Sequence, residues 1–300
     1  MRIAYIGRFD VRWNELGISE CLKSLGHEVL ELEEGSSKIV ERILEWRPDF
    51  VLCAKLRVDN ASHLITVLKH EKIPLVSWTF DLYWDYVREP HIPTYPFLKA
   101  DLVVTTDGGH DERWKEAGIP HVTIRQGIHP KDAWIAKVPH QYDVVFVGSY
   151  NSHHPYRQQM LAALQENFNL AWFGLRDEMR GEKLNNLIGS AKIILGDSVI
   201  SPNYWSNRIY ETIGRGGFYI HPFVEGIDKE FTPDQEAVYY EPYNLGELMD
   251  KIAYYLKAED EREAIAQAGF ARCVKEHNFI NRCKTLCEIL EQRIIGIRES

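Results

Sequence analysis

The stretch that decides the fold class is "RIAYIGRFDVRWNELGISECLKSLGHEVLEL", residues Arg2–Leu32. A short apolar run opens it, an amphipathic segment follows from Arg12 to Leu25, and a second apolar run begins after Gly26. A glycine at this place is a common signal for the end of a helix. Two strands joined by a helix of crossover length are typical of a parallel sheet covered on both faces. We therefore expect a parallel strand, helix, strand unit here.

The same alternation continues almost to the end of the chain. The further strand-like runs are "PDFVLCA", "PLVSWTF", "DLVVTT", "HVTIRQG", "YDVVFVG", "LAWFG", "KIILG", "GFYIHP" and "AVYY". Helix-period segments separate most of them, and three more helical segments follow at residues 245–256, 260–276 and 280–295. This pattern predicts an α/β protein with two doubly wound, Rossmann-like domains and a C-terminal helical tail.

The boundary between the two domains falls where the alternation pauses. Residues 127–141 contain two prolines and show weak periodicity, which is typical of a linker. The expected parts are an N-terminal domain over 1–130, a linker over 131–141, a second domain over 142–280, and a helix over 281–300 that packs back toward the first. Because open parallel sheets bind ligands at the carboxyl ends of their strands, the cleft between the domains is the expected site.

The composition excludes several classes of protein. Hydrophobic residues make up 45% of the chain and aromatic residues 12%, so ordinary globular cores are expected rather than disorder. The 35 basic and 44 acidic side chains give a net charge of -9, which disfavours a general polyanion binder. The five cysteines lack a framework spacing, which indicates reduced thiols. Since neither a signal-peptide pattern nor a long apolar window occurs, we expect a soluble, cytoplasmic protein.

A second stretch, "SNRIYETIGRGGFYI" at residues 206–220, places a carboxylate between two arginines. Ser206 is a good N-cap for a helix that ends before the paired glycines. Arg208, Glu211 and Arg215 are then spaced so that they share one side of this helix. One interpretation is a surface salt-bridge ladder worth about 0.2 to 0.5 kcal/mol per pair. The other is a ligand site, in which the helix start and Arg208 hold a phosphate and Glu211 binds a sugar diol.

This stretch, with its continuation "HPFVEGIDKEF" and the later "YYEPYNLGELMDKIAYYL" and "EREAIAQAGFARCVKEHNFINRC", resembles the C-terminal domain of the CgeB-like glycosyltransferases. "VVFVGSYNSHHPYRQQMLAAL" is similar to the start of the same domain, and "DLVVTTDGGHDERWKEAGIPHVTIRQGIHP" to the end of the N-terminal one. That family belongs to the transferase superfamily with two Rossmann domains (GT-B). The resemblance covers most of the chain and implies a nucleotide-sugar-binding C-terminal domain and an acceptor-side N-terminal domain.

The resemblance also implies roles for individual residues. Glu211 would hold the ribose hydroxyls of a donor, a UDP-sugar or another nucleoside-diphosphate sugar. Arg208 would contact the diphosphate and stabilise the leaving group, beside the amides of Ser206 and Asn207. Related retaining enzymes carry a second glutamate eight positions before the ribose one, near the donor sugar, and this sequence has Asn203 there. This departure leaves a retaining and an inverting reaction open.

Two loops in the first half of the chain supply further candidates. "GRFDVRWNE" follows the first strand and lacks the GxGxxG pattern of dinucleotide dehydrogenases. Gly7 and Arg8 are candidates for the diphosphate and Asp10 for the acceptor, the alternative being a solvated loop pair. "SWTFDLYWD" follows the fourth strand, and its aromatic residues would give Asp81 the apolar surroundings that a general base needs. The alternative is that Asp81 caps a turn.

A loop in the second half, "FVGSYNSHHPYR", ends a strand and enters a helix. Gly148 and Ser149 would let the backbone approach the phosphates, and Arg157 would reach them. Gly127, at the end of "HVTIRQG", is a further candidate for contact with the donor. The adjacent histidines at 153–154 are expected to be solvated rather than to bind a metal.

The sequence thus predicts a glycosyltransferase that needs no metal ion and no cofactor, with Asp81, Asp10 and Arg208 as catalytic candidates. Absence of an Asp-x-Asp pair favours charge neutralisation by arginine. One alternative is a catalytically silent nucleotide-sugar binder, supported by Asn203, and another is an epimerase or hydrolase on the same fold. The acceptor is left open among a saccharide, a lipid-linked sugar, a protein, a small molecule and modified DNA.

Overall fold

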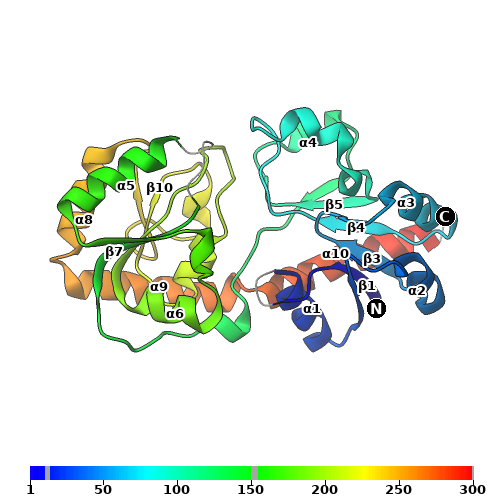
Figure 1. The fold of residues 1–300 in the computed structure, drawn as a ribbon, viewed down its shortest axis with the longest axis horizontal. Coiled ribbons are helices and arrows are strands. Elements are labelled where there is room, and N and C mark those ends of the chain that lie inside the picture. The colour runs from blue at the N-terminus through cyan, green and yellow to red at the C-terminus, as the bar shows by residue number, and fades with distance from the viewer. Residues whose placement is uncertain (11–13, 150–154, 299–300) are drawn as a thin grey trace. The chain divides into compact units, whose positions relative to one another are not determined.

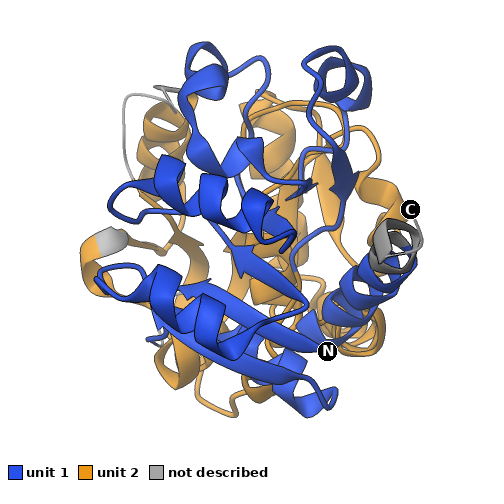
Figure 2. Cartoon of the chain, turned by 90° about the vertical axis from the view of Figure 1, so that its right-hand side faces the viewer, with its two compact units in different colours: residues 1–126, 279–300 blue, residues 127–278 orange. Residues whose placement is uncertain are grey.

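The computed structural model describes residues 1–10, 14–149 and 155–298 of the 300-residue chain. The chain divides into two compact units (Figure 2). Unit 1 comprises residues 1–126 and 279–300, and unit 2 comprises residues 127–278. The segment 127–141 therefore belongs to unit 2, and the C-terminal helix belongs to unit 1.

Unit 1 is built on a six-stranded parallel sheet with the strand order β2-β1-β3-β4-β5-β6 (Figure 1). The strands are β1 (Arg2–Gly7), β2 (Glu28–Glu33), β3 (Phe50–Cys53), β4 (Leu75–Trp78), β5 (Leu102–Thr105) and β6 (His121–Thr123). The helices are α1 (Asn14–Ser24), α2 (Ile39–Trp46), α3 (Ala61–His70), α4 (Asp111–Glu116) and α10 (Phe279–Arg298), with 3-10 turns η1 (Glu89–Thr94) and η2 (Pro96–Lys99).

The period of two along each strand gives this sheet two buried faces. On β1, Ile3 and Tyr5 pack in one apolar cluster with α1 and α10, whereas Ala4 and Ile6 pack in another with α2 and α3. The helix α10, drawn in red in Figure 1, contacts α1 and contributes Cys283 to the first cluster. Helices on both faces explain why the strands are apolar throughout rather than alternating.

Unit 2 is built on a five-stranded parallel sheet with the order β11-β10-β9-β7-β8. Its strands β7 and β10 are labelled in Figure 1. The strands are β7 (Tyr142–Val147), β8 (Leu170–Phe173), β9 (Ala191–Leu195), β10 (Tyr219–Pro222) and β11 (Val238–Tyr240). The helices are α5 (Pro155–Asn167), α6 (Gly181–Gly189), α7 (Arg208–Ile213), α8 (Leu245–Tyr255) and α9 (Glu259–Glu276), with 3-10 turns η3 (Pro130–Asp132), η4 (Leu175–Asp177) and η5 (Ile227–Lys229).

The two faces of this second sheet are also covered by helices. Val145 packs in one cluster with residues of α6 and α7, and the adjacent Phe146 packs in another with residues of α5 and α8. The predicted pair of doubly wound domains is confirmed. All five cysteines are buried and free. Within the described ranges, no helix combines the length and the apolar character that crossing a membrane requires.

Each sheet has one point at which the strand order reverses. In unit 1 the chain moves from β1 outward to β2 and then returns to β3 on the other side. In unit 2 it moves from β7 outward to β8 and returns to β9. Loops at the carboxyl ends of the two strands beside such a switch point diverge, and open α/β sheets bind ligands there. Two switch points, one in each unit, are thus the places to examine for a site.

Candidate functional site

The switch point of unit 2 brings Gly148, after β7, against Arg208, at the start of α7. A Cβ atom on Gly148 would lie 2.9 Å from Nη2 of Arg208 and 2.9 Å from the ring of Phe146. The guanidinium carbon of Arg208 lies 5.6 Å from the centroid of that ring. Trp172 donates a 2.8 Å hydrogen bond from Nε1 to the carbonyl oxygen of Gly148, which fixes the loop from the other side. Only glycine lets the backbone come this close to the guanidinium.

Arg208 carries a positive charge that no described carboxylate neutralises. Its Nη1 donates to the backbone carbonyl of Asp197 at 3.4 Å, and no ion pair links it to any acidic side chain in the described ranges. Burial lowers the pKa of Arg208, and the neighbouring cation of Arg157 lowers it further. Since arginine stays protonated in proteins, the site holds a cation in a place that favours binding of an anion.

Arg157, on α5, is the second cation of this site, and its charge is compensated. Its side chain is 2% exposed, and Nε donates to Oδ2 of Asp197 at 2.7 Å. Nη1 donates to the backbone carbonyl of Ser149 at 2.5 Å. These bonds tie the loop after β7 to the loop after β9. The structure therefore directs these donors of Arg157 toward protein groups and leaves Arg208 as the cation without a described carboxylate partner.

The helix that carries Arg208 begins one residue later than predicted. The expected N-cap at Ser206 is wrong, because Asn207 occupies the cap position and makes no side-chain cap hydrogen bond. Asn207 already has helical dihedral angles, so the chain turns into the helix without an extended cap residue. The Oγ of Ser206 instead accepts a 3.4 Å hydrogen bond from the backbone N–H of Arg208. Both residues are partly exposed and lie next to the guanidinium-bearing residue.

Glu211 takes part in a buried cluster rather than in a surface ladder. Its Oε2 accepts a hydrogen bond from Nη1 of Arg215, and its side chain is 22% exposed. Arg215 is only 1% exposed. Its guanidinium also donates to Asn185 at 2.8 Å and to Asp132 at 2.7 Å. The interpretation as a surface ladder is therefore wrong for Arg215, and no ion pair joins Glu211 to Arg208 among the described side chains.

The segment 127–141 explains this burial. A Cβ on Gly214 would lie 2.7 Å from the side chain of Ile128, and one on Gly216 would lie 2.6 Å from that of Ile135. Gly216 also has a φ of 80°, which ends the helix. These two glycines let the segment pack onto the end of α7 and cover Arg215. No local pattern in the sequence indicates this contact, because the segment 127–141 has the composition of a linker.

Two further predicted donor residues have mainly backbone roles in the structure. Gly127 packs against backbone, since a Cβ there would lie 2.8 Å from the carbonyl oxygen of His277. Asn203 has a φ of 51° in a tight turn, and its side chain contacts Gly226, whose own φ is 89°. Asparagine tolerates this left-handed conformation better than glutamate does. The turn thus gives a physical reason for asparagine where related retaining enzymes carry a carboxylate.

Sequence reasoning missed several buried polar groups beside this site. Among the buried side-chain atoms without a hydrogen-bond partner in the described part of the chain, four lie on β10 or in the loop after β9: Oγ of Ser198, Oγ of Ser201, the hydroxyl of Tyr219 and Nε2 of His221. Nδ1 of His221 contacts the carbonyl oxygen of Pro222 at 2.7 Å, and burial lowers the pKa of His221 to about 4. His221 is therefore neutral near pH 7. The available signal in the sequence was that two residues with polar groups, Tyr219 and His221, occupy alternate positions of the apolar run "GFYIHP".

The arginine that follows β1, at the switch point of unit 1, has a carboxylate partner. Nε of Arg8, after β1, donates to Oε2 of Glu34 at 3.0 Å. Gly7 is also close-packed, since a Cβ there would lie 2.8 Å from Cγ of Glu15. Asp10 follows in the same loop and is partly exposed. These three predicted residues lie together at the carboxyl end of β1.

Asp81, after β4, does not have the apolar surroundings that were predicted for it. One carboxylate oxygen lies 2.5 Å from Nζ of Lys55, and the other lies 3.3 Å from Nη2 of Arg88. The correction arises because Lys55 approaches from the loop after β3, which local sequence composition does not reveal. A role of Asp81 as a base would require these ion pairs to open.

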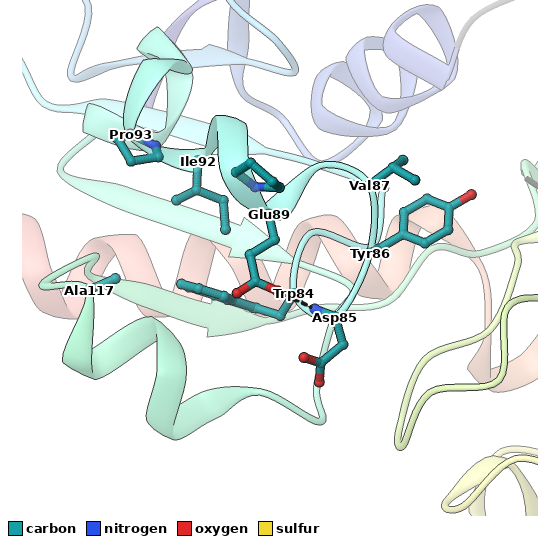
Figure 3. A pocket seen from close by; sticks show the side chains of 9 residues that line it. Trp84, Asp85, Tyr86, Val87, Glu89, Ile92, Pro93 and Ala117 are labelled. Carbon is teal, nitrogen blue, oxygen red and sulfur yellow. Dashed lines mark hydrogen bonds between the residues drawn. The ribbon is translucent and has the colours of Figure 1, made fainter.

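Unit 1 also contains an open pocket of about 790 Å³ (Figure 3). It is lined by Trp84, Asp85, Tyr86, Val87, Glu89, Pro90, Ile92, Pro93 and Ala117. Arg113 lies over the ring of Trp84 at 4.6 Å and donates to both carboxylates of the lining. None of the predicted site residues lines this pocket.

The described residues include no cluster of three or more histidine, cysteine, aspartate or glutamate side chains arranged for a metal ion. The histidines at 153–154 lie outside the described residues. The charged groups at the unit 2 switch point are thus arginines and one aspartate.

Part of the chain matches a known protein family. Residues 157–288 match a family model described as glycosyl transferase-like. The predicted resemblance to glycosyltransferases is confirmed at this level, and its CgeB-like part stays a prediction. No curated protein sequence matches the chain.

Several solved structures share the fold. Sucrose-phosphate synthase from Thermosynechococcus elongatus is similar, with a TM-score of 0.69 and 12% identity over 99% of this chain and 100% of that one. HepE from Anabaena, solved with UDP-glucose, has a TM-score of 0.66 and 11% identity over 97% of this chain and 100% of that one. A glycosyltransferase from Rickettsia africae ESF-5 has a TM-score of 0.62 and 15% identity over 98% of each chain. At these identities the likeness establishes the two-domain GT-B fold.

Proposed function

We propose that the protein is a glycosyltransferase that takes a nucleoside-diphosphate sugar as its donor and binds that donor on unit 2. The observation that carries the proposal is the guanidinium of Arg208, which lies at the switch point and has no carboxylate partner among the described residues. A diphosphate supplies the negative charge that this guanidinium lacks, through charge-assisted hydrogen bonds of about 1.5 to 3 kcal/mol each. HepE, which binds UDP-glucose on the same fold, supports this donor class.

The neighbouring residues supply the remaining contacts of the proposal. Gly148 and Ser149 bring backbone close to the diphosphate, and Ser206 and Asn207 flank it. Glu211, three residues after Arg208, accepts hydrogen bonds from the ribose hydroxyls. Transfer of the sugar develops negative charge on the leaving diphosphate, so Arg208 stabilises the transition state more than it stabilises the bound donor. Charge neutralisation by arginine replaces a metal ion in this proposal.

The acceptor is assigned to unit 1 in this proposal. Asp10 and Asp81 lie at the carboxyl ends of β1 and β4, where open sheets bind ligands. The acceptor classes are those left open by the sequence. A second candidate function, a nucleotide-sugar binder without turnover, is favoured by one observation: Asn203 stands where related retaining enzymes carry a glutamate.

A thermal-shift screen of UDP, GDP, ADP, CDP and dTDP tests the donor pocket first. A ligand present at 100 times its Kd adds about 2.7 kcal/mol to the free energy of unfolding, which gives a measurable shift. The donor sugars of the nucleotide that binds are then incubated with and without a panel of acceptors, and released diphosphate is measured. Release that requires an acceptor supports transfer. Binding without release favours the silent binder, and no shift with any nucleotide contradicts the donor pocket.

A further inference from the structure

We propose that Arg215 is a positioning residue that holds the carboxylate of Glu211 in the orientation needed for the donor. The role of Glu211 itself rests on the proposed function. The hydrogen bonds of Arg215 to described residues all lie within unit 2. The sequence pattern places Arg215 only in a salt-bridge ladder, and the family resemblance assigns it no role toward the donor.

The contacts of Arg215 use every nitrogen of its guanidinium. Nε donates to Oδ1 of Asn185 at 2.8 Å, and Nη2 donates to Oδ2 of Asp132 at 2.7 Å. Nη1 donates to the backbone carbonyl of Glu211 at 2.9 Å and to its carboxylate Oε2. With 1% exposure, the guanidinium has no water shell to exchange with. Three segments, 127–141, α6 and α7, thus fix it in one place.

Asn185 in turn has a single orientation. Its amide nitrogen donates to the carbonyl oxygens of Asp132 at 2.9 Å and Trp134 at 2.7 Å, and its side chain is fully buried. Because the nitrogen takes both carbonyls, the oxygen must face Arg215. The amide nitrogen and oxygen of Asn185 are therefore both hydrogen-bonded, and they hold the guanidinium of Arg215 in one position. A residue that contacts a ligand needs a support that is fixed in this way.

The consequence for Glu211 is that its two oxygens have different tasks. Oε2 is held by Arg215, whereas Oε1 has no hydrogen-bond partner among the residues that the structure describes. The side chain is 22% exposed, so Oε1 can accept a hydrogen bond from a hydroxyl group. An unrestrained glutamate side chain can rotate about three bonds, and it loses this conformational entropy when a ligand binds. Because Arg215 already holds the carboxylate of Glu211, that entropic cost does not weaken ligand binding.

Arginine is needed for this arrangement, which makes a lysine variant informative. The planar fork bonds three different side chains at once, whereas an ammonium on a flexible stem has a single centre. Arg215→Lys keeps the charge in the cluster and removes the fork. A suitable control is Arg262→Lys, since Arg262 is also buried in unit 2, at 3% exposure, and donates to the carbonyl of Tyr255.

The experiment measures the Kd of UDP, or of the nucleotide that gives the largest thermal shift, for five proteins: wild type, Glu211→Gln, Arg215→Lys, the double variant of these two, and the control Arg262→Lys. We expect the affinity for the nucleotide to fall about tenfold in Glu211→Gln and in Arg215→Lys, since one charge-assisted hydrogen bond accounts for roughly that factor. The double variant is expected to stay within twofold of Glu211→Gln, because Arg215 acts through Glu211. Arg262→Lys is expected to bind within twofold of wild type.

Losses that multiply in the double variant, or wild-type affinity in Arg215→Lys, would overturn the proposal. Crystal structures of wild type and Arg215→Lys give a readout that does not depend on any ligand. A displaced or disordered Glu211 carboxylate supports positioning, and an unmoved one refutes it. If wild type binds no nucleotide, the proposed function fails while this structural test still decides the positioning role. If Arg215→Lys does not fold, Asp132→Ala, whose native side chain is 29% exposed, is expected to weaken binding severalfold, and unchanged affinity contradicts the proposal.

Discussion

The switch points of the two units have the same topology and different charge balance. In unit 1, Arg8 after β1 donates to Glu34, and Lys55 after β3 pairs with Asp81. In unit 2, Asp197 neutralises Arg157, and Arg208 has no carboxylate partner within the described ranges. Each sheet therefore provides a place for a ligand, and the side chains decide what kind of ligand fits it.

This difference shows how one fold divides its tasks. A crevice that holds an uncompensated cation next to glycine backbone favours a polyanion such as a diphosphate. A crevice in which the arginine already has a carboxylate partner, as Arg8 has in unit 1, offers a smaller gain to an anion, and it suits a ligand without net charge, such as a hydroxylated acceptor. If nucleotide binding follows the charge balance, substitution of the arginine without a carboxylate partner should weaken it most, and substitution of a compensated arginine should weaken it least.

Removing the uncompensated cation is expected to have the largest effect. In Arg208→Gln, turnover of a nucleotide-sugar donor should fall about 100-fold to 1000-fold, the usual loss when one group that stabilises developing charge is removed. The melting temperature should not fall, because burial and Arg157 already disfavour the charge of Arg208. Release of diphosphate and thermal unfolding of the same preparation measure both effects.

Arg157→Gln is the matched control in the same site. It leaves Asp197, 10% exposed, without its partner, so it should lower the free energy of unfolding by about 3 kcal/mol. A stable Arg157→Gln protein whose nucleotide affinity falls as far as that of Arg208→Gln would show that the two arginines share the anion, contrary to the comparison.

The buried histidine of unit 2 predicts the next effect, on stability against pH. The pKa of His221 is lowered to about 4 by burial, whereas an exposed histidine titrates near 6.5. Between these values the unfolded chain binds the proton and the folded chain does not, so stability falls as the pH falls from about 6.5 to 4. A pKa shift of this size corresponds to a loss of roughly 3 kcal/mol in the free energy of unfolding once the pH is below both values.

Urea unfolding at pH 7 and pH 4.5 measures this loss in wild type and in His221→Gln. The groups that influence His221 electrostatically are Asp197 and Arg208, and both are retained in this variant. The variant should lose clearly less stability than wild type over this range. Equal losses in the two proteins would mean that His221 is not the group responsible.

The sequence predicted the alternation of strands and helices well, because strands buried on both faces are apolar throughout and glycines mark the helix ends. For the candidate site, the sequence indicates which side chains lie together only where those residues are close in sequence. Arg208 and Glu211 lie on one short helix after a strand, so their spacing brings them together. The burial of Arg215 depends on Asp132, which is 83 residues away, and no local pattern reveals such a contact. The ion pair of Asp81 with Lys55 escaped prediction for the same reason.

A side chain at Gly148 is expected to have an intermediate effect. In Gly148→Ala the new Cβ would lie 2.9 Å from Nη2 of Arg208, which forces the guanidinium to move. We expect about a tenfold weaker binding of UDP and a loss of stability of about 1 kcal/mol, at the low end for overpacking. Calorimetric titration with UDP measures the first. In the control Gly174→Ala, the new Cβ would have its nearest contact at 3.8 Å, and wild-type affinity there is required for the interpretation.

The smallest effect is expected at the switch point of unit 1, although the sequence made Arg8 a candidate for the diphosphate. Its guanidinium donates to Glu34 at 3.0 Å, so its charge is already compensated. Arg8→Ala should therefore bind UDP within twofold of wild type in the same titration, while Arg208→Gln does not. A tenfold loss in Arg8→Ala would show that a compensated arginine still contributes to nucleotide binding. Charge balance would then be the wrong criterion for separating the two switch points, and the donor contacts would have to be extended to unit 1.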